Sequence, residues 1–153
     1  MTEGASIYVP ALFLFRKSEW QLSNLKLQKI LYFAQMISLG RFGQELIRDD
    51  FQAWPLGPVN ATLYHACKIY GPDPVESLSN PFKGGRNLSE QEEELLNEIL
   101  QVLGRKSISS LIGISHWKQG AWSKNYVAGE KYIVIPKEDM LEEYETRERL
   151  SIA

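Results

Sequence analysis

The amino-acid sequence predicts a mainly α fold, a compact single-domain helical structure with a small β element: a short strand near residues 50–54 and another at residues 132–135. Apolar residues recur at three- and four-residue intervals along most of the chain, which is the spacing of one helix face. The chain has 153 residues, an ordinary length for one domain, and no repeat or long linker divides it. We therefore expect residues 1–153 to form one domain.

Two helices are predicted in the N-terminal part of the chain. Pro10 opens the first, because a proline at the first helical position removes no hydrogen bond. The second covers residues 24–39, with Ser23 as its N-cap and Gly40 as the residue that ends it. Its predicted apolar face consists of Leu27, Ile30, Leu31, Ala34 and Ile37, and Lys26, Lys29 and Gln35 are expected to lie away from that face.

The pattern changes after the second helix. Residues 51–54 alternate as a short strand does, and the sequence Trp-Pro-Leu-Gly-Pro at residues 54–58 then turns the chain. Pro58 is predicted to open a third helix over residues 58–70, with Gly57 as its cap. Three prolines and two glycines make residues 72–87 a long loop.

The C-terminal part is again mainly helical. Ser89 and Glu92 form a capping box before a helix that ends near Leu103, with an inner stripe that includes Val102. A further helix follows Ser107, and a short turn begins at residues 120–122. The strand at residues 132–135 precedes an acidic final helix over residues 137–149.

Composition and charge narrow the possible functions. The formal net charge of −2 argues against a generally basic nucleic-acid binder, although residues 89–103 carry five Glu and residues 104–129 carry four basic residues. Cys67 is the only cysteine, so the chain contains no internal disulfide. The chain has no basic leader and no apolar run long enough to span a bilayer, so we expect a cytoplasmic protein without a membrane partner.

The sequence offers no constellation of residues for catalysis. His65 and His116 are far apart in the chain, and Cys67 lies on the apolar face of a predicted helix. Asp49 and Asp50 are adjacent, so they point to opposite sides of an extended segment. Phosphate-binding glycine loops and the Gly-x-Ser-x-Gly elbow are absent. We therefore expect no catalytic residue, metal site or cofactor, and expect that the protein is not an enzyme.

Aromatic residues and prolines near turns are the stronger functional signal. Trp54, Pro55, Leu56 and Pro58 form one turn, and Trp122 flanks another. Tryptophan is enriched among the residues that dominate binding energy at protein interfaces. The alternative is that Trp54 and Trp122 close the core between helices, and a half-buried tryptophan can fill both roles.

Two segments of the chain resemble a known family. Residues 22–35, LSNLKLQKILYFAQ, and residues 51–59, FQAWPLGPV, are similar to the signature segments of the Panacea antitoxin domain family of SocA-like and GepA-like, phage-associated bacterial proteins. The resemblance covers roughly residues 6–145 and includes Tyr64, Ser115–His116 and Trp122. Pro10 and Ala121 depart from the family pattern, which usually has an apolar or small residue and a proline at these positions.

This resemblance implies an antitoxin that neutralises a cognate protein toxin by direct stoichiometric binding. It also implies an alternative, an adaptor that delivers a toxin to a AAA+ protease, as one SocA-like relative does. A third reading is an enzyme that reverses a modification installed by the toxin. We expect no nucleic acid among the partners.

The residues predicted to bind the partner come from the two signature segments and their surroundings. The pair Lys26 and Lys29, with the turn at residues 54–58, would line the partner site. In the structural alternative, Gln28 and Lys29 hold that turn by hydrogen bonds to backbone carbonyls. The full predicted set is Lys26, Gln28, Lys29, Trp54, Pro55, Gly57, Pro58, Tyr64 and Trp122.

Overall fold

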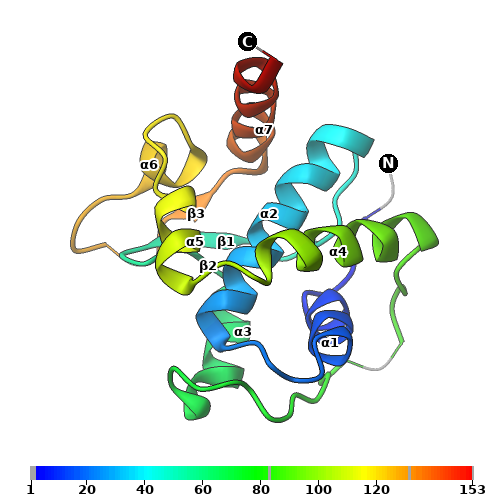
Figure 1. Cartoon of the computed structure of the whole chain (residues 1–153). Coiled ribbons are helices and arrows are strands. Elements are labelled where there is room, and N and C mark those ends of the chain that lie inside the picture. Colours follow the sequence, from blue (N-terminus) through cyan, green and yellow to red (C-terminus); the bar gives the residue numbers. More distant parts are fainter. Residues whose placement is uncertain (1–2, 83, 131, 153) are drawn as a thin grey trace.

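A long helix, α2 (Asn24–Phe42), runs through the middle of the molecule, and most other elements pack around it (Figure 1). The computed structural model describes residues 3–82, 84–130 and 132–152. Ser23 caps α2 as predicted, because its side chain accepts a hydrogen bond from the Lys26 N–H. The predicted end at Gly40 is wrong: the helix continues to Gly43, which has the left-handed φ of 67°. Gly40 instead gives room to the Tyr144 ring, which lies where a β-carbon would project.

The N-terminal helix α1 (Tyr8–Lys17) begins two residues before Pro10, so the prediction that Pro10 opens it is wrong by that margin. The strand prediction near residues 50–54 is confirmed by β1 (Phe51–Trp54), which is the central strand of a three-stranded antiparallel sheet. β2 (Gly57–Val59) pairs with one edge of β1, and β3 (Val134–Ile135) pairs with the other edge. β3 lies within the predicted strand at residues 132–135 and is shorter than that prediction.

The predicted helix over residues 58–70 is wrong at its start. Pro58 lies in β2, opposite Ala53, and Asn60 is the true N-cap. The Asn60 side chain accepts a hydrogen bond from the Leu63 N–H at 2.9 Å. The helix α3 (Ala61–Cys67) is therefore short, and a 3-10 turn, η1 (Lys68–Tyr70), continues it to Gly71.

The C-terminal elements follow the predicted order. α4 (Glu90–Leu103) begins with the capping box of Ser89 and Glu92. It is followed by α5 (Ile108–Ser115), the short α6 (Ala121–Asn125) and α7 (Lys137–Ile152). One part of the α4 prediction is wrong, because Val102 is 59% exposed rather than turned inward. No helix among the described residues combines the length and the apolar character that crossing a bilayer requires.

The core surrounds α2 on most sides, and α7 closes it. Leu31 and Tyr32 are fully buried. The Tyr32 hydroxyl donates to Glu143 Oε1 on α7 at 2.6 Å, and the same oxygen accepts from the Ala121 N–H at 3.0 Å. Arg147 donates from Nε to the other Glu143 oxygen, Oε2, at 2.8 Å. This buried carboxylate therefore joins α2, α6 and α7.

Candidate functional site

Two polar side chains of α2 are buried against the segment that follows the β1–β2 hairpin. Gln28 is fully buried, its Oε1 accepts from the Asn60 N–H at 2.8 Å, and its Nε2 donates to the Asn60 carbonyl at 3.3 Å. One turn earlier, Asn24 Nδ2 donates to the Tyr64 carbonyl at 3.0 Å. Both amides thus satisfy backbone groups that would otherwise be buried without partners, which is costly. Gln28 presents no surface to a partner in this structure.

Lys29 is also fully buried, although the sequence pattern places it away from the apolar face of its helix. Its Nζ donates to the Pro58 carbonyl at 3.0 Å. Burial disfavours the ammonium form and lowers the pKa of Lys29 from 10.5 to about 7. This hydrogen bond fits the structural alternative given above, in which Lys29 holds the turn by bonding one of its backbone carbonyls.

Gly57 allows this close approach of α2 and the hairpin. Its φ of 110° is a conformation that residues with a β-carbon rarely adopt. A β-carbon at this position would lie 2.7 Å from Ser115 Oγ and 2.8 Å from Lys29 Cε. The hairpin can therefore rest on Lys29 and the end of α5 only because residue 57 has no side chain.

Trp122 supports the other side of the hairpin. It is 8% exposed, and its Nε1 donates to the Trp54 carbonyl at 2.7 Å. The His116 ring stacks on Trp122 with a centroid distance of 3.8 Å, and Tyr126 stacks on Trp122 at 4.5 Å. Burial, and then the nearby charge of Lys29, lower the pKa of His116 below 6.5, so the imidazole is neutral at pH 7.

The tip of the hairpin is the exposed part of this region. We use the name hairpin tip for Trp54, Pro55, Leu56 and the adjacent Tyr64. Pro55 and Leu56 are exposed, Leu56 by 49%, whereas Trp54 is half-buried. The Trp54 ring packs edge-to-face on Tyr64 at 5.0 Å, and its Nε1 donates to Gln52 Oε1 at 2.9 Å. The tip therefore presents apolar surface on a support held by the hydrogen bonds of Lys29, Gln28 and Trp122.

The structure brings together most of the predicted partner-binding residues. Lys26 lies in the first turn of α2 and is partly exposed, unlike the buried Gln28 and Lys29. Sequence reasoning missed two residues that support this region, Gln35 and Asn60. Gln35 is fully buried and bonds the backbone of Leu46 and Ile47. The sequence signal for this role is that Gln35 is a lone polar residue within the apolar run 30–37. Asn60 was detectable as a helix N-cap.

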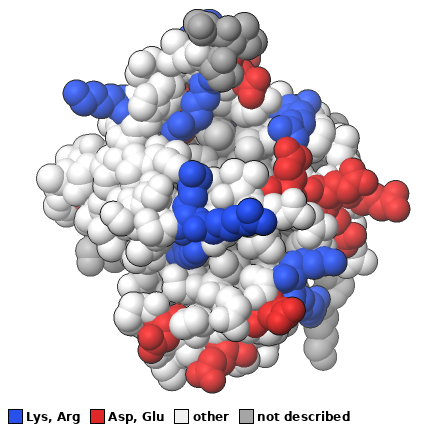
Figure 2. Space-filling model, viewed as in Figure 1, with Lys and Arg blue, Asp and Glu red and all other residues white. Residues whose placement is uncertain are grey.

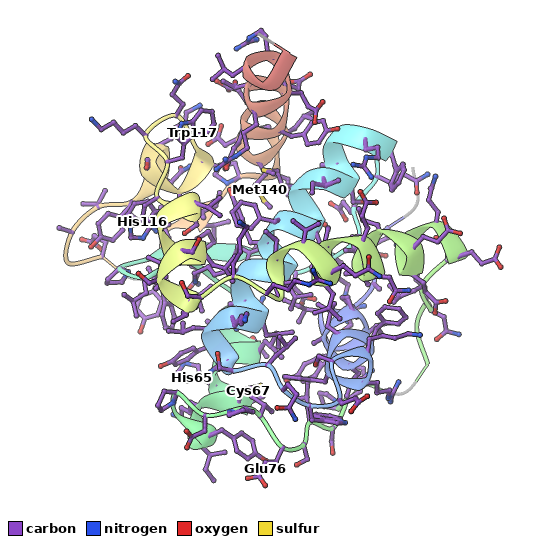
Figure 3. The ribbon with its side chains drawn as sticks, viewed as in Figure 1. His65, Cys67, Glu76, His116, Trp117 and Met140 are labelled. Carbon is purple, nitrogen blue, oxygen red and sulfur yellow. The ribbon has the colours of Figure 1, made fainter. Side chains whose placement is uncertain are left out.

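The histidine and the cysteine of α3 lie in different environments. His65 is exposed, and Cys67, two residues later on α3, is buried (Figure 3). Burial raises the pKa of the Cys67 thiol to about 11, so the reactive thiolate is scarce at neutral pH. Among the described residues, no group of three or more His, Cys, Asp or Glu side chains is placed to hold a metal ion.

Comparison with known proteins agrees with the two signature segments. The family model described as "Antitoxin SocA-like, Panacea domain" matches residues 27–123. Antitoxin SocA of Caulobacter vibrioides (strain NA1000 / CB15N) is 31% identical over 109 residues, which cover 66% of this chain and 58% of that protein. The chain thus spans less than two thirds of the length of that relative. No solved structure matches the chain. The match over most of the chain shows that it belongs to the family of SocA-like antitoxins with a Panacea domain.

Proposed function

We propose that this chain neutralises a cognate protein toxin by direct, stoichiometric binding, acting as a single cytoplasmic domain and without chemical turnover. Membership of an antitoxin family supports a toxin as the partner. The main support for direct binding is the hairpin tip. Its apolar side chains are exposed, and the hydrogen bonds of Lys29, Gln28 and Trp122 hold it in place. A surface that is ordered before binding loses little conformational entropy when a partner docks.

The hairpin tip is the surface we propose for toxin contact, with Trp54, Pro55, Leu56 and Tyr64 touching the partner. In this proposal Gln28, Lys29, Gly57, Pro58 and Trp122 act indirectly, because they are buried and hold the tip in place. Lys26 lies at the start of α2 and would contact the partner only at the edge of the interface.

The test uses the protein encoded by the reading frame adjacent to this gene as the toxin. Co-expression with the wild-type chain should restore growth, and the two purified proteins should form a complex of fixed stoichiometry. Leu56→Arg should weaken this complex by roughly 30-fold, as loss of an interface anchor does. Ile69→Arg is the matched control, since Ile69 is 84% exposed on η1. Circular dichroism should show that both variants are folded.

Other outcomes distinguish the alternative functions. Loss of the toxin from cells, with its half-life restored when a AAA+ protease is deleted, would identify the adaptor mechanism. Protection at a small fraction of the toxin concentration would identify an enzyme. A wild-type chain that neither binds the neighbouring protein nor restores growth would contradict the proposal.

A further inference from the structure

A small pocket lies beside the hairpin tip, where the starts of α2 and α5 meet α3 and the residues that follow η1. We call it the Tyr64 pocket, and it encloses about 210 Å³. Its walls include Leu25, Tyr64, Lys68, Gly71, Pro72 and Ile108. The side chains of Leu25 and Ile108 are only partly covered, so the pocket offers apolar surface to solvent.

Hydrogen bonds fix the walls of this pocket. The buried Asn24 donates from Nδ2 to the Tyr64 carbonyl at 3.0 Å, which joins α2 to α3. The Val75 N–H donates to the Leu22 carbonyl at 2.9 Å, which ties the loop after η1 to the residue pair before α2. A pocket that is formed before binding loses little conformational entropy when a side chain enters it.

Tyr64 makes the pocket continuous with the surface proposed above for toxin contact. Its ring packs edge-to-face against Trp54 with a centroid distance of 5.0 Å, and Tyr64 also lines the pocket. A partner that covers the hairpin tip therefore reaches the Tyr64 pocket without crossing other elements.

Positive charge surrounds the pocket. Lys68 lines it, Lys26 follows the lining residue Leu25, and Arg105 and Lys106 come three and two residues before Ile108. Among the residues that the structure describes, none of these four cations forms an ion pair. Figure 2 shows Lys and Arg side chains gathered near the middle of this face, over the end of α4 and its connection to α5.

Acidic residues do not offset this charge. None of the described residues that line the pocket is acidic. Within three residues of a lining position the chain has the four cations named above and one acidic residue, the exposed Asp73. Glu98 of α4 lies farther along the chain and is already paired with Arg41 at 3.4 Å. The unmatched charge at this pocket is therefore positive, which favours an acidic partner.

The size and the walls of the pocket favour a polypeptide. Pockets for drug-sized ligands usually enclose about 300–1,000 Å³, so this one is small. Four cations on a chain of net charge −2 would give only weak, salt-sensitive binding to nucleic acid. Apolar walls with charge at the rim match the usual anatomy of a protein interface, an apolar centre within a polar edge.

We propose that the Tyr64 pocket receives an apolar side chain from an acidic segment of the toxin. The Asp and Glu side chains of that segment face Lys26, Lys68 and Lys106. This inference rests on the proposed function and deepens it, because it extends the contact beyond the hairpin tip and states the chemistry of the partner.

The first test places an acidic side chain in the pocket and uses the neighbouring-gene protein as the probe. Ile108→Asp removes apolar wall and opposes an acidic partner, so the dissociation constant measured by calorimetry should rise roughly 30-fold. Ile108 is the first residue of α5, where a negative charge suits the helix dipole, so the variant should fold, as circular dichroism can verify.

The matched control for this variant is Ser110→Asp. Ser110 lies in the same first turn of α5, is exposed and does not line the pocket. It carries the same added charge and should bind within about threefold of the wild type, because two residues along a helix place the side chain on a different face. A loss as large as that of Ile108→Asp would overturn the role of the pocket.

The second test reverses one charge at the rim. Lys68→Glu should weaken binding about fivefold to tenfold at low salt and reduce its dependence on salt concentration. Lys118→Glu, at an exposed position between α5 and α6, makes the same change in net charge and should bind within about twofold of the wild type. Stronger binding by Lys68→Glu would exclude an acidic partner.

The remaining outcomes separate this inference from the proposed function. If the wild type binds and restores growth while Ile108→Asp and Lys68→Glu bind within twofold of it, the pocket inference is overturned and the antitoxin function stands. If the wild type binds a short DNA duplex and Lys68→Glu abolishes that binding, the basic rim is a nucleic-acid site and the inference is wrong. If Ile108→Asp converts a wild-type dimer into a monomer, the pocket joins two copies of the chain and the inference is again wrong. If the wild type itself fails to bind the neighbouring-gene protein, both proposals fall together.

Discussion

The two sides of α2 differ in what they leave exposed. The side that faces the hairpin and the segment before β1 buries polar groups, namely Gln28, Lys29 and Gln35, each bonded to backbone atoms. The side that faces α4 and α7 also buries one polar contact, between Tyr32 and Glu143, but it borders a groove in which apolar groups, above all Val102, are exposed. Buried polar groups that are fully paired fix the geometry of neighbouring loops, whereas exposed apolar clusters usually mark sites of association. We therefore propose that the buried polar groups of α2 fix the neighbouring loops and that exposed apolar side chains contact a partner.

The largest expected loss of stability comes from removing the buried hydrogen bonds of Gln35. Its side chain accepts from the N–H groups of Leu46 and Ile47, both at 2.9 Å, and donates to the Ile47 carbonyl at 2.7 Å. Gln35→Leu leaves these buried backbone groups unpaired, so the free energy of unfolding should fall by about 3 kcal/mol or more. Urea denaturation measures this loss. Gln91→Leu, at an exposed position of α4, should change it by less than about 0.5 kcal/mol.

A smaller effect, a pH dependence of the free energy of unfolding, tests the burial of Lys29. Its pKa is about 7 in the folded protein and 10.5 without burial, so between these values the unfolded chain holds a proton that the folded chain has released. The free energy of unfolding therefore rises with pH above pH 7, by up to about 1.4 kcal/mol per pH unit, and the gain is lost as pH falls toward 7. Lys29→Met removes this term.

The measurement compares urea denaturation of the wild type and Lys29→Met at pH 7, 8 and 9. The wild-type stability should rise relative to the variant across this range. His116 does not interfere, because its lowered pKa keeps it neutral at these pH values. If the free energies of unfolding of the two proteins change in parallel with pH, the prediction is wrong and the Lys29 ammonium keeps its charge in the folded state.

The smallest expected effect concerns the apolar exterior. Val102→Ala should change the free energy of unfolding by less than about 0.5 kcal/mol, because the side chain is mostly exposed and alanine favours the helix. Ile99, three residues earlier on α4, is only 4% exposed, and Ile99→Ala should cost about 2–4 kcal/mol. Thermal denaturation of both variants checks the contrast. A large loss from Val102→Ala would mean that the groove serves the core of this chain.

Local signals in the sequence predicted much of the fold. Ser23 and the capping box at Ser89 mark helix starts correctly, since a cap depends only on residues within one turn. Gly40 misled the prediction because its neighbour, Tyr144, is distant in the sequence. Pro58 misled it because pairing with Ala53 in the sheet outweighs the preference of proline for a helix start.

The candidate site could be predicted only in part, and for a related reason. The two signature segments correctly mark where α2 meets the hairpin, and Lys29 does bond a carbonyl of the turn. A 3.6-residue period ranks the faces of a helix by apolar content, so it predicts that Lys29 and Gln35 are exposed. In the structure, β2 covers Lys29 and the segment before β1 covers Gln35. The same period predicts that Val102 is buried, whereas it is exposed. Periodicity does not tell whether another element is present to cover a helix face.

The buried carboxylate of Glu143 has a consequence for genetic damage. Tyr32, Ala121 and Arg147 all bond to it, so α2, α6 and α7 depend on one group. A truncation before α7 would strand the Tyr32 hydroxyl in the interior without this acceptor. A nonsense mutation that removes α7 should therefore destabilise the helices encoded well before it.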